Sequence, residues 1–220
     1  FLLDLQPDER RSLFFTIRCA EKKSPHPERR NFSSALRQAS DQRQGIVDRM
    51  AMVEASNSIF NEIISRAAED LAMLDTATPQ GIYPYAGIPW YSTVFGRDGM
   101  ITAMQMLWVD PKMALGVLRF LAAHQATECI PEEDAEPGKI LHEMRFGEMA
   151  RLKEVPFGLY YGSADSTPLF VMLAGMYRER TGDRAAIEEL WPHIEAALRW
   201  MDEYGDSDDD GFIEYGAKTS

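Results

Sequence analysis

The sequence has few cysteines, and it has no apolar run long enough to cross a bilayer. Its 2 cysteines, Cys19 and Cys129, lie far apart and belong to no Cys-x-x-Cys pattern. We interpret both as reduced thiols, which are typical of a cytoplasmic protein. No segment has the charge and apolar pattern of a signal peptide, so the sequence predicts a cytoplasmic location and no membrane partner.

Basic residues are also scarce. The chain of 220 residues has 23 lysines and arginines against 35 acidic residues, which gives a formal net charge of −12. Such a surface repels phosphate backbones and anionic lipids, and this excludes nucleic acid and membrane surfaces as expected partners. A neutral sugar polymer carries no charge to repel. The charge balance therefore permits a carbohydrate partner without indicating one.

Several motifs that bind cofactors or metals are missing. There is no glycine-rich phosphate loop and no Gly-x-Ser-x-Gly nucleophile motif. His142-Glu143 lacks the second histidine of a His-Glu-x-x-His zinc site. Residues 206–210 begin like a calcium-binding loop, but Ala217 stands where such a loop requires a bidentate glutamate. We interpret this segment as a polar turn, and we expect neither a metal nor a cofactor.

The first part of the chain differs in pattern from the rest. From residue 13 to residue 19 apolar side chains alternate with others after a turn-forming segment, which predicts a β-hairpin. A lone hairpin is too small to be stable, so we expect residues 1–20 to end a β-domain that lies mostly upstream. Residues 21–31 are charged and contain two prolines. We therefore predict a linker over residues 21–50 and a helical domain over residues 51–220.

Apolar residues recur at helical spacing through this second part. The segments from Val53 to Leu74 and from Ile187 to Met201 carry one apolar and one polar face, so we expect surface helices there. The segments from Met113 to Ala123 and from Leu169 to Tyr177 are apolar nearly all round and predict helices buried on every side. Buried and half-buried helices in alternation favour two concentric layers, as in an α/α toroid. Any large helical domain shows some layering, so the pattern is not specific to the toroid.

An unusually aromatic segment lies between Gly81 and Gly99. Its glycines and prolines predict an irregular loop rather than a helix. Trp90, Tyr91 and Phe95 offer flat apolar faces that suit sugar rings. We expect such a loop to line a cavity or to cover a core.

Arg97 and Asp98 follow this loop, directly before a helix that we predict from Met100 to Trp108. An arginine fork beside a carboxylate can grip the vicinal hydroxyls of a sugar, because the first donates hydrogen bonds and the second accepts them. The alternative is structural, with Asp98 as a helix cap and member of an ion pair. The residues alone leave both interpretations open.

Asp165 is predicted to lie just outside the N-terminus of a buried helix. The helix dipole lowers the pKa of such a carboxylate, whereas a general acid requires a raised pKa. Asp165 can act as an acid if apolar burial, to which Tyr160 and Tyr161 could contribute, outweighs the dipole. The alternative is a capping role.

The segment from Gly138 to Glu148 places acidic, basic and hydrogen-bonding groups side by side. Its candidate functional residues are His142, Glu143 and Arg145. A solvated loop is the alternative, because charged runs are common on protein surfaces.

Together these segments resemble the bacterial amylo-α-1,6-glucosidase-like glycosidases, which are relatives of glycogen debranching enzyme in the six-hairpin glycosidase superfamily. The resemblance covers nearly the whole chain from Phe32 onward, with its motifs in the expected order. These motifs are Ala86-Gly-Ile-Pro-Trp-Tyr with Phe95-Gly-Arg-Asp, Gly138-Lys-Ile-Leu-His-Glu-Met-Arg, Tyr160-Tyr-Gly-Ser-Ala-Asp-Ser-Thr-Pro-Leu-Phe, and Asp208-Asp-Asp-Gly-Phe-Ile-Glu-Tyr. Four long motifs in register are more specific than any one of them alone.

The resemblance implies an inverting glycoside hydrolase that acts on the α-glucosidic bonds of a glucan or glucoside. It implies an (α/α)6 barrel, with residues 51–220 as its N-terminal half and residues 1–20 as the last strands of a β-sandwich domain. Asp165 is then the general acid. The general base is a glutamate of a segment that has no counterpart in this chain, so we expect the chain alone to be incomplete as an enzyme. The implied substrate-binding residues are Trp90, Tyr91, Phe95, Arg97, Asp98, His142, Glu143, Arg145 and Tyr161.

Two other functions stay open at this point. A sugar epimerase or lyase on the same toroid would use a histidine or tyrosine base, such as His142, and would tolerate the loss of Asp165. A non-catalytic glycan-binding module would keep the aromatic loop but need no pair of carboxylates. A hydrolysis assay run beside a glucan-binding assay distinguishes this module from an enzyme.

Overall fold

The computed structural model describes residues 4–15, 17, 31–155 and 158–214. The chain divides into two compact units, Phe1–Gly45 and Ile46–Ser220. The division falls within the stretch that the sequence predicts as a linker. Across the described residues the fold is mainly helical with two small antiparallel sheets, which confirms the mainly α class.

The first unit begins with extended chain. Residues 4–15 and 17 form no strand, so the predicted β-hairpin is wrong for these residues. Its other residues, Cys19 among them, lie outside the described part of the chain. Two short strands are marginally stable without a larger sheet to join, and the turn at Pro7 and Asp8 therefore leads into unpaired chain.

Helix α1 spans Phe32–Val47, so much of the segment predicted as a linker is helical. The helix begins after Asn31, whose side chain accepts a hydrogen bond from the backbone N–H of Ser34 at 2.8 Å. None of the α1 residues is buried. Its helical structure therefore rests on capping and local propensity rather than on a packed face.

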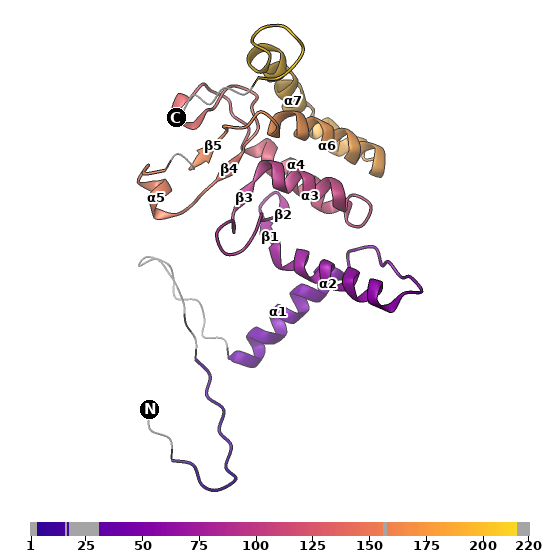
Figure 1. Cartoon of the computed structure of the whole chain (residues 1–220), viewed down its shortest axis with the longest axis vertical. Coiled ribbons are helices and arrows are strands. Elements are labelled where there is room, and N and C mark those ends of the chain that lie inside the picture. The colour runs from indigo at the N-terminus through magenta and orange to yellow at the C-terminus, as the bar shows by residue number, and fades with distance from the viewer. Residues whose placement is uncertain (1–3, 16, 18–30, 156–157, 215–220) are drawn as a thin grey trace. The chain divides into compact units, whose positions relative to one another are not determined.

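The second unit contains the remaining helices and strands of the described residues (Figure 1). The helices are α2 (Ser58–Leu74), α3 (Gly96–Met106), α4 (Pro111–Ala123), α5 (Glu148–Arg151), α6 (Ser166–Thr181) and α7 (Arg184–Trp200), with short turns η1 (Pro131–Glu133) and η2 (Met201–Gly205). The strands are β1 (Asp75–Thr78), β2 (Gly81–Pro84), β3 (Val94–Phe95), β4 (Glu143–Met144) and β5 (Leu159–Tyr160). None of the described helices is long and apolar enough to cross a membrane.

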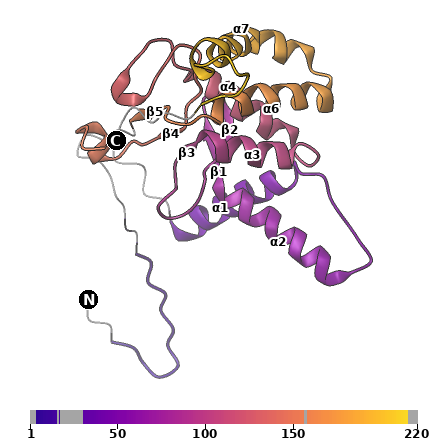
Figure 2. The same cartoon turned by 45° about the horizontal axis from the view of Figure 1, so that its top comes forward.

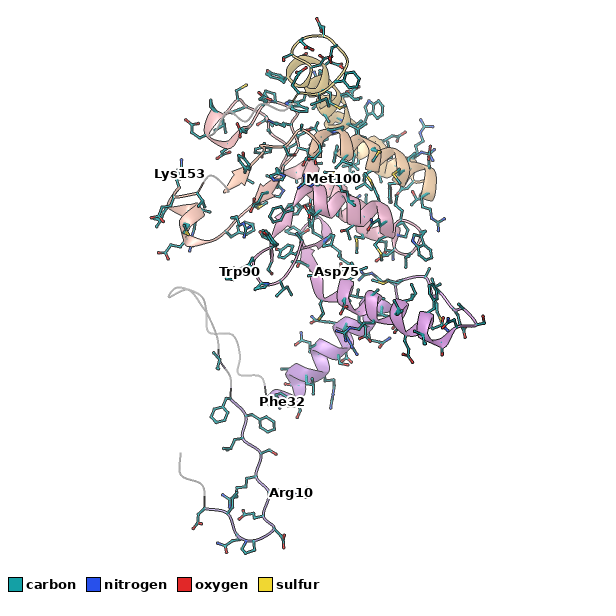
Figure 3. All side chains as sticks on the ribbon, in the orientation of Figure 1. Arg10, Phe32, Asp75, Trp90, Met100 and Lys153 are labelled. Carbon is teal, nitrogen blue, oxygen red and sulfur yellow. The ribbon has the colours of Figure 1, made fainter. Side chains whose placement is uncertain are left out.

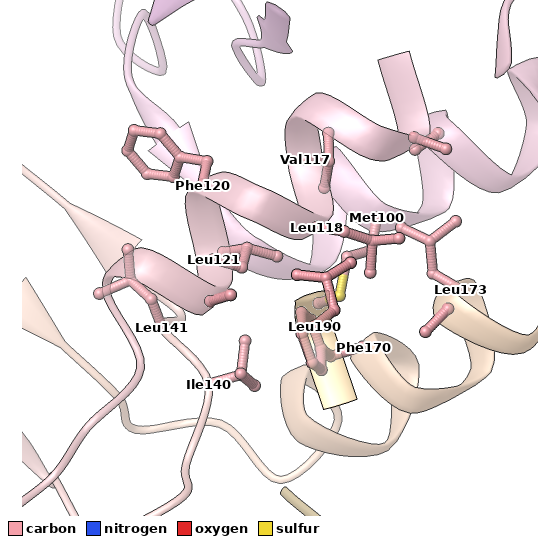
Figure 4. Packing of buried hydrophobic residues seen from close by; sticks show 14 of the residues in the cluster. Met100, Val117, Leu118, Phe120, Leu121, Ile140, Leu141, Phe170, Leu173 and Leu190 are labelled. Carbon is pink, nitrogen blue, oxygen red and sulfur yellow. The ribbon is translucent and has the colours of Figure 1, made fainter. Parts of the chain in front are cut away.

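The hydrophobic core lies among α3, α4, α6 and α7, which pack side by side in both views (Figures 1 and 2). Helix α4 provides the largest share, and its Val117, Leu118 and Leu121 are completely buried. They form one cluster with Met100 of α3 and Phe170 of α6 (Figure 4). The prediction of a buried helix at this position is confirmed.

Two other helices depart from their predictions. Helix α6 is not buried on every side, because Met172 and Met176 are 50% and 37% exposed on a face that no described element covers. Helix α2 begins at Ser58 and not at Val53. The reason is Asn57, whose side chain accepts two backbone N–H groups of the first turn and so fixes where the helix starts.

The hairpin of β1 and β2 packs on α4. Its antiparallel register pairs Asp75 with Pro84. The close approach requires glycine on both elements: Gly81 has a φ of +136°, and a Cβ on Gly116 of α4 would lie 2.3 Å from the carbonyl oxygen of Ile82. The hairpin is thereby held against the helix that forms most of the core.

An ion-pair cluster lies at the start of β1. Nη2 of Arg49 donates to the carboxylates of Asp75 and Asp110 at 3.4 and 3.2 Å. Both carboxylate side chains are only 2% exposed. Burial raises the pKa of Asp75 to about 6, although the Arg49 charge opposes the rise. The second unit therefore contains a buried acid that titrates close to neutral pH.

Candidate active site

Three segments that are distant in the sequence meet at the small sheet of β3, β4 and β5. Strand β4 is central and pairs antiparallel with both neighbours. Directly before it, the backbone of His142 accepts the N–H of Gly96 and donates to the carbonyl of Tyr160, both at 2.8 Å. A Cβ at position 96 would lie 2.0 Å from the carbonyl oxygen of Leu141, so this approach requires glycine. The sheet thus brings the start of α3 close to the chain that leads into α6.

Arg97, in the first turn of α3, and Asp165, directly before α6, form an ion pair. Nη1 of Arg97 lies 2.9 Å from Oδ2 of Asp165, and the side chains are 47% and 40% exposed. Oδ1 of Asp165 accepts a hydrogen bond from the Ser163 hydroxyl at 2.9 Å. Partial burial acts to raise the pKa of Asp165, but the hydrogen bonds from Arg97 and Ser163 outweigh it and hold the pKa below its ordinary value of 3.8. Asp165 is therefore ionised at neutral pH in this arrangement.

Asp98 does not cap the helix. Helix α3 begins at Gly96 with Phe95 as its N-cap, so the predicted start at Met100 and the capping role are both wrong. Both Arg97 and Asp98 instead border a cavity of about 190 Å³ between α2, the β1–β2 hairpin and α3. Its other lining residues are Leu71, Leu74, Pro84, Tyr85, Ala86, Ile101 and Thr102.

The imidazole of His142 lies between two aromatic rings. It meets Phe95 and Tyr160 edge to face, with ring centres 6.1 and 6.0 Å away. Its Nδ1 is buried and has no hydrogen-bond partner. Burial lowers the pKa of His142, and the nearby Arg97 charge acts in the same direction against the surrounding carboxylates. The ring is therefore neutral at neutral pH.

Arg145 holds the aromatic loop against the sheet. Its Nε donates to the buried carboxylate of Glu143, and its Nη1 donates to the carbonyl oxygen of Trp90 at 2.7 Å. Its guanidinium carbon lies 5.6 Å from the centre of the Phe95 ring. The structure thus places Glu143 and Arg145 as supports of the loop. The supported surface is open to solvent, since Trp90 is 78% and Tyr91 56% exposed. Figure 3 labels Trp90 in this loop.

Tyr161 lies apart from this cluster. Its side chain is buried in the core, and its hydroxyl donates to the carbonyl oxygen of His124 at 2.8 Å. Burial raises the pKa of Tyr161 to about 12. Tyr160, the last residue of β5, packs on His142 instead.

A second group of carboxylates lies after α7. Asp206, Asp208, Asp210 and Glu214 each bring one oxygen within 4.8 Å of the others. Asp206 also accepts the backbone N–H of Asp210 at 3.0 Å, as expected for a polar turn. Ala217, which departs from the calcium-loop pattern, lies outside the described residues. Oxygen donors of this kind suit a hard cation such as Ca²⁺.

Comparison with known proteins adds no assignment. No protein-family model matches the chain, and no curated protein matches it significantly. What the site can do is therefore inferred from its own groups: a carboxylate held by an arginine, a neutral imidazole with an unpaired nitrogen, and exposed aromatic faces. Such a set can bind a neutral polyol, and its carboxylic acid, once protonated, can donate a proton.

Proposed function

We propose that this chain forms part of an inverting glycoside hydrolase that acts on α-glucosidic bonds, similar to the bacterial amylo-α-1,6-glucosidases that its motifs resemble. The observation that carries the proposal is that the Arg97–Asp165 pair lies near His142, whose ring contacts Phe95 of the aromatic loop. These groups come from three separate motifs. A sugar ring requires such a combination, because it presents hydroxyls at its edges and apolar C–H groups on its faces.

The proposed fold of the second unit is the N-terminal half of an (α/α)6 barrel. The exposed face of α6, with Met172 and Met176, supports this arrangement. In a closed barrel further helices would cover such a face, since large apolar side chains are rarely left in water over a continuous surface.

Asp165 is the proposed general acid. It protonates the glycosidic oxygen while the bond from that oxygen to the anomeric carbon breaks. A glutamate from outside this chain removes a proton from the attacking water on the opposite face of the sugar. The two carboxyl groups of such a pair lie roughly 6.5–9.5 Å apart, which leaves room for the water.

The ion pair between Arg97 and Asp165 has to open before this step. Sugar hydroxyls that accept hydrogen bonds from Arg97 would take away the group that keeps the pKa of Asp165 low. A bound sugar would also displace water from the carboxyl, and the effect of burial would then dominate and raise its pKa. Substrate binding itself would in this way make Asp165 competent as an acid.

The remaining residues have binding roles in the proposal. Trp90 and Tyr91 offer ring faces to the sugar, and Phe95 packs edge to face on the imidazole of His142, whose partly exposed ring contacts the sugar. Asp98 accepts hydroxyl hydrogens, because it is exposed beside the cavity and no described residue forms a hydrogen bond with its side chain. No cofactor takes part in this chemistry.

A second candidate function is a non-catalytic glycan-binding module. The specific observation in its favour is the same ion pair, because an ionised Asp165 can accept hydrogen bonds from sugar hydroxyls while Arg97 donates hydrogen bonds to them, and no proton is transferred. In such a module Arg97 and Asp165 would contribute to glycan binding and not to catalysis.

The test compares two substrates in the protein that carries this chain. Asp165→Asn should nearly abolish the hydrolysis of a natural α-glucoside, since general acid help contributes about 10²–10⁴-fold. Hydrolysis of α-glucosyl fluoride should survive much better, because fluoride departs with little protonation. Glu189→Gln is the matched control: it removes another exposed carboxylate paired with an arginine, Arg119, outside the site, and should change neither rate.

Three outcomes contradict the proposal. Equal losses on both substrates would make Asp165 a binding residue. Glucan binding without any hydrolysis would favour the binding module. Activity that tolerates Asp165→Asn but disappears with His142→Gln would favour a sugar epimerase or lyase.

A further inference from the structure

The carboxylate of Asp165 has a partner on each of its two oxygens. Oδ2 accepts from Arg97 and Oδ1 accepts from Ser163, both at 2.9 Å. Arg97 is a long and exposed side chain that a ligand can draw away. Ser163 is short and only 7% exposed, and its hydroxyl is anchored from behind. The two partners of Asp165 therefore differ: Arg97 is long and exposed, whereas Ser163 is short and buried.

The anchor of Ser163 is a second buried hydroxyl. Ser166 is completely buried, its Oγ lies 2.7 Å from Oγ of Ser163, and its backbone N–H donates to the same oxygen at 3.2 Å. Gly96 of α3 packs against this pair, since a Cβ there would lie 3.2 Å from Oγ of Ser166. The hydroxyl pair thus lies where the first residues of α3 and α6 meet.

The number of hydrogens fixes the direction of these bonds. Each hydroxyl has one hydrogen to donate. An ionised Asp165 has none, so the hydrogen of Ser163 must point to Oδ1, and Ser166 must donate to Ser163 through both its hydroxyl and its N–H. With these directions, each of the contacts among Asp165, Ser163 and Ser166 has one donor and one acceptor. Hydrogen bonds are thus donated from Ser166 to Ser163 and from Ser163 to Asp165. They hold the plane of the Asp165 carboxylate even when Arg97 no longer contacts it.

We propose that Ser163 is a positioning residue for Asp165: with Ser166 behind it, it fixes the orientation of the carboxyl group and leaves Oδ2 as the oxygen that faces the ligand. The proposed role as a general acid supplies the reason for this arrangement, since a proton donor must present one chosen oxygen to the glycosidic bond. The hydrogen bond between Ser163 and Asp165 is present whether or not Asp165 acts as a general acid. The other charged or titratable groups nearby are Arg97 and Asp98 of α3 and His142 before β4.

The test is the titration of the Asp165 carboxyl carbon by ¹³C NMR in this chain, which requires no activity. Ser163→Ala removes the hydrogen bond to the charged form, so the pKa of Asp165 should rise toward its ordinary value of 3.8. Ser163→Thr keeps the hydroxyl and should titrate as the wild type does. Ser166→Ala keeps the direct donor and should shift the pKa less than Ser163→Ala. If Ser163→Ala does not fold, Ser163→Cys replaces the strong donor by a weak one and serves in its place.

A merely structural role gives a different result. Ser163 also accepts the N–H of Ser166, so Ser163→Ala loses a bond at the start of α6 and should melt at a lower temperature in either case. An unchanged titration in Ser163→Ala would overturn the proposal, and so would equal shifts in the alanine and threonine variants. In the active enzyme the alkaline limb of the pH profile should move to higher pH in Ser163→Ala. Absence of hydrolysis would contradict the proposed function and leave the titration result unaffected.

Discussion

Arg145 offers a direct measure of how firmly the aromatic loop is held. We predict that Arg145→Met destabilises the protein by about 3 kcal/mol. The substitution keeps the apolar stem that covers Phe95 and removes the guanidinium. It therefore breaks two contacts together, the ion pair with Glu143 and the hydrogen bond to the carbonyl of Trp90.

The magnitude follows from the burial of the two partners. The Glu143 side chain is 9% exposed and the Arg145 side chain 32%. Breaking a fully buried pair costs ~3–5 kcal/mol, because a charge is left without a partner, whereas exposed pairs contribute ~0–1 kcal/mol. A pair with one buried and one half-buried member should lie between these limits, at about 2 kcal/mol. The hydrogen bond to Trp90 adds about 1 kcal/mol.

The assay is urea unfolding of the two single variants and the double variant with Glu143→Gln. Because the glutamine carries no charge, Arg145→Met should cost about 2 kcal/mol less in that background than alone. Arg184→Met is the matched control, since its pair with Glu188 is 80% and 64% exposed, and it should change stability by less than about 0.5 kcal/mol. A coupling between Glu143 and Arg145 below about 0.5 kcal/mol would refute the reasoning.

Two further predictions concern Asp98 and Asp75. Asp98→Asn should cut kcat/KM on an α-glucoside by about 10²-fold or more through lost substrate positioning, with little change in melting temperature because Asp98 caps no helix. Steady-state kinetics and thermal melting check this, and the opposite pattern would mark Asp98 as structural. Asp75 has a folded pKa of about 6, above its ordinary 3.8, so its contribution to stability is complete below pH 3.8 and is lost as the pH rises through 6. Asp75→Asn should therefore raise the free energy of unfolding at pH 8, by at most about 3 kcal/mol, and leave it unchanged near pH 3. Urea unfolding at both values measures the difference, and a larger gain at pH 3 would contradict it.

Long apolar patterns were sufficient to predict the helices of the core. Residues 113–123 lie within α4, and residues 187–200 lie within α7, because a sustained helical period leaves few other ways to bury those side chains. The start of α2 was not predictable from the pattern, since it depends on one hydrogen-bonding residue, Asn57. The hairpin expected within residues 1–20 is absent from the described residues. Alternation of apolar residues alone does not supply the partner strands that a sheet requires.

The candidate site was predicted as a set of residues but not as a set of contacts. Its sheet consists of strands of two residues each, too short for alternation to reveal. Arg97 and Asp165 are 68 positions apart, so no local pattern indicates that they pair. The only sequence signal at Ser163 is that it lies two residues before Asp165, and a serine at this spacing from an aspartate is common in turns. Such contacts follow from how β4 joins its neighbours, which is a property of the fold.

The lowered pKa of Asp165 is the strongest physical objection to its proposed role as a general acid. The ion pair that lowers this pKa is exposed, however, and is therefore weak. Arg97 and Asp165 are 47% and 40% exposed, so their pair should contribute no more than ~0–1 kcal/mol. A hydrogen bond between a sugar hydroxyl and a charged group, donated by Arg97 or accepted by Asp98, contributes about 1.5–3 kcal/mol. One or two such bonds to Arg97 and Asp98 therefore suffice to open the pair when substrate binds. A carboxyl released from its arginine, but still held by Ser163, would then titrate under the influence of burial. This is the direction that a general acid requires.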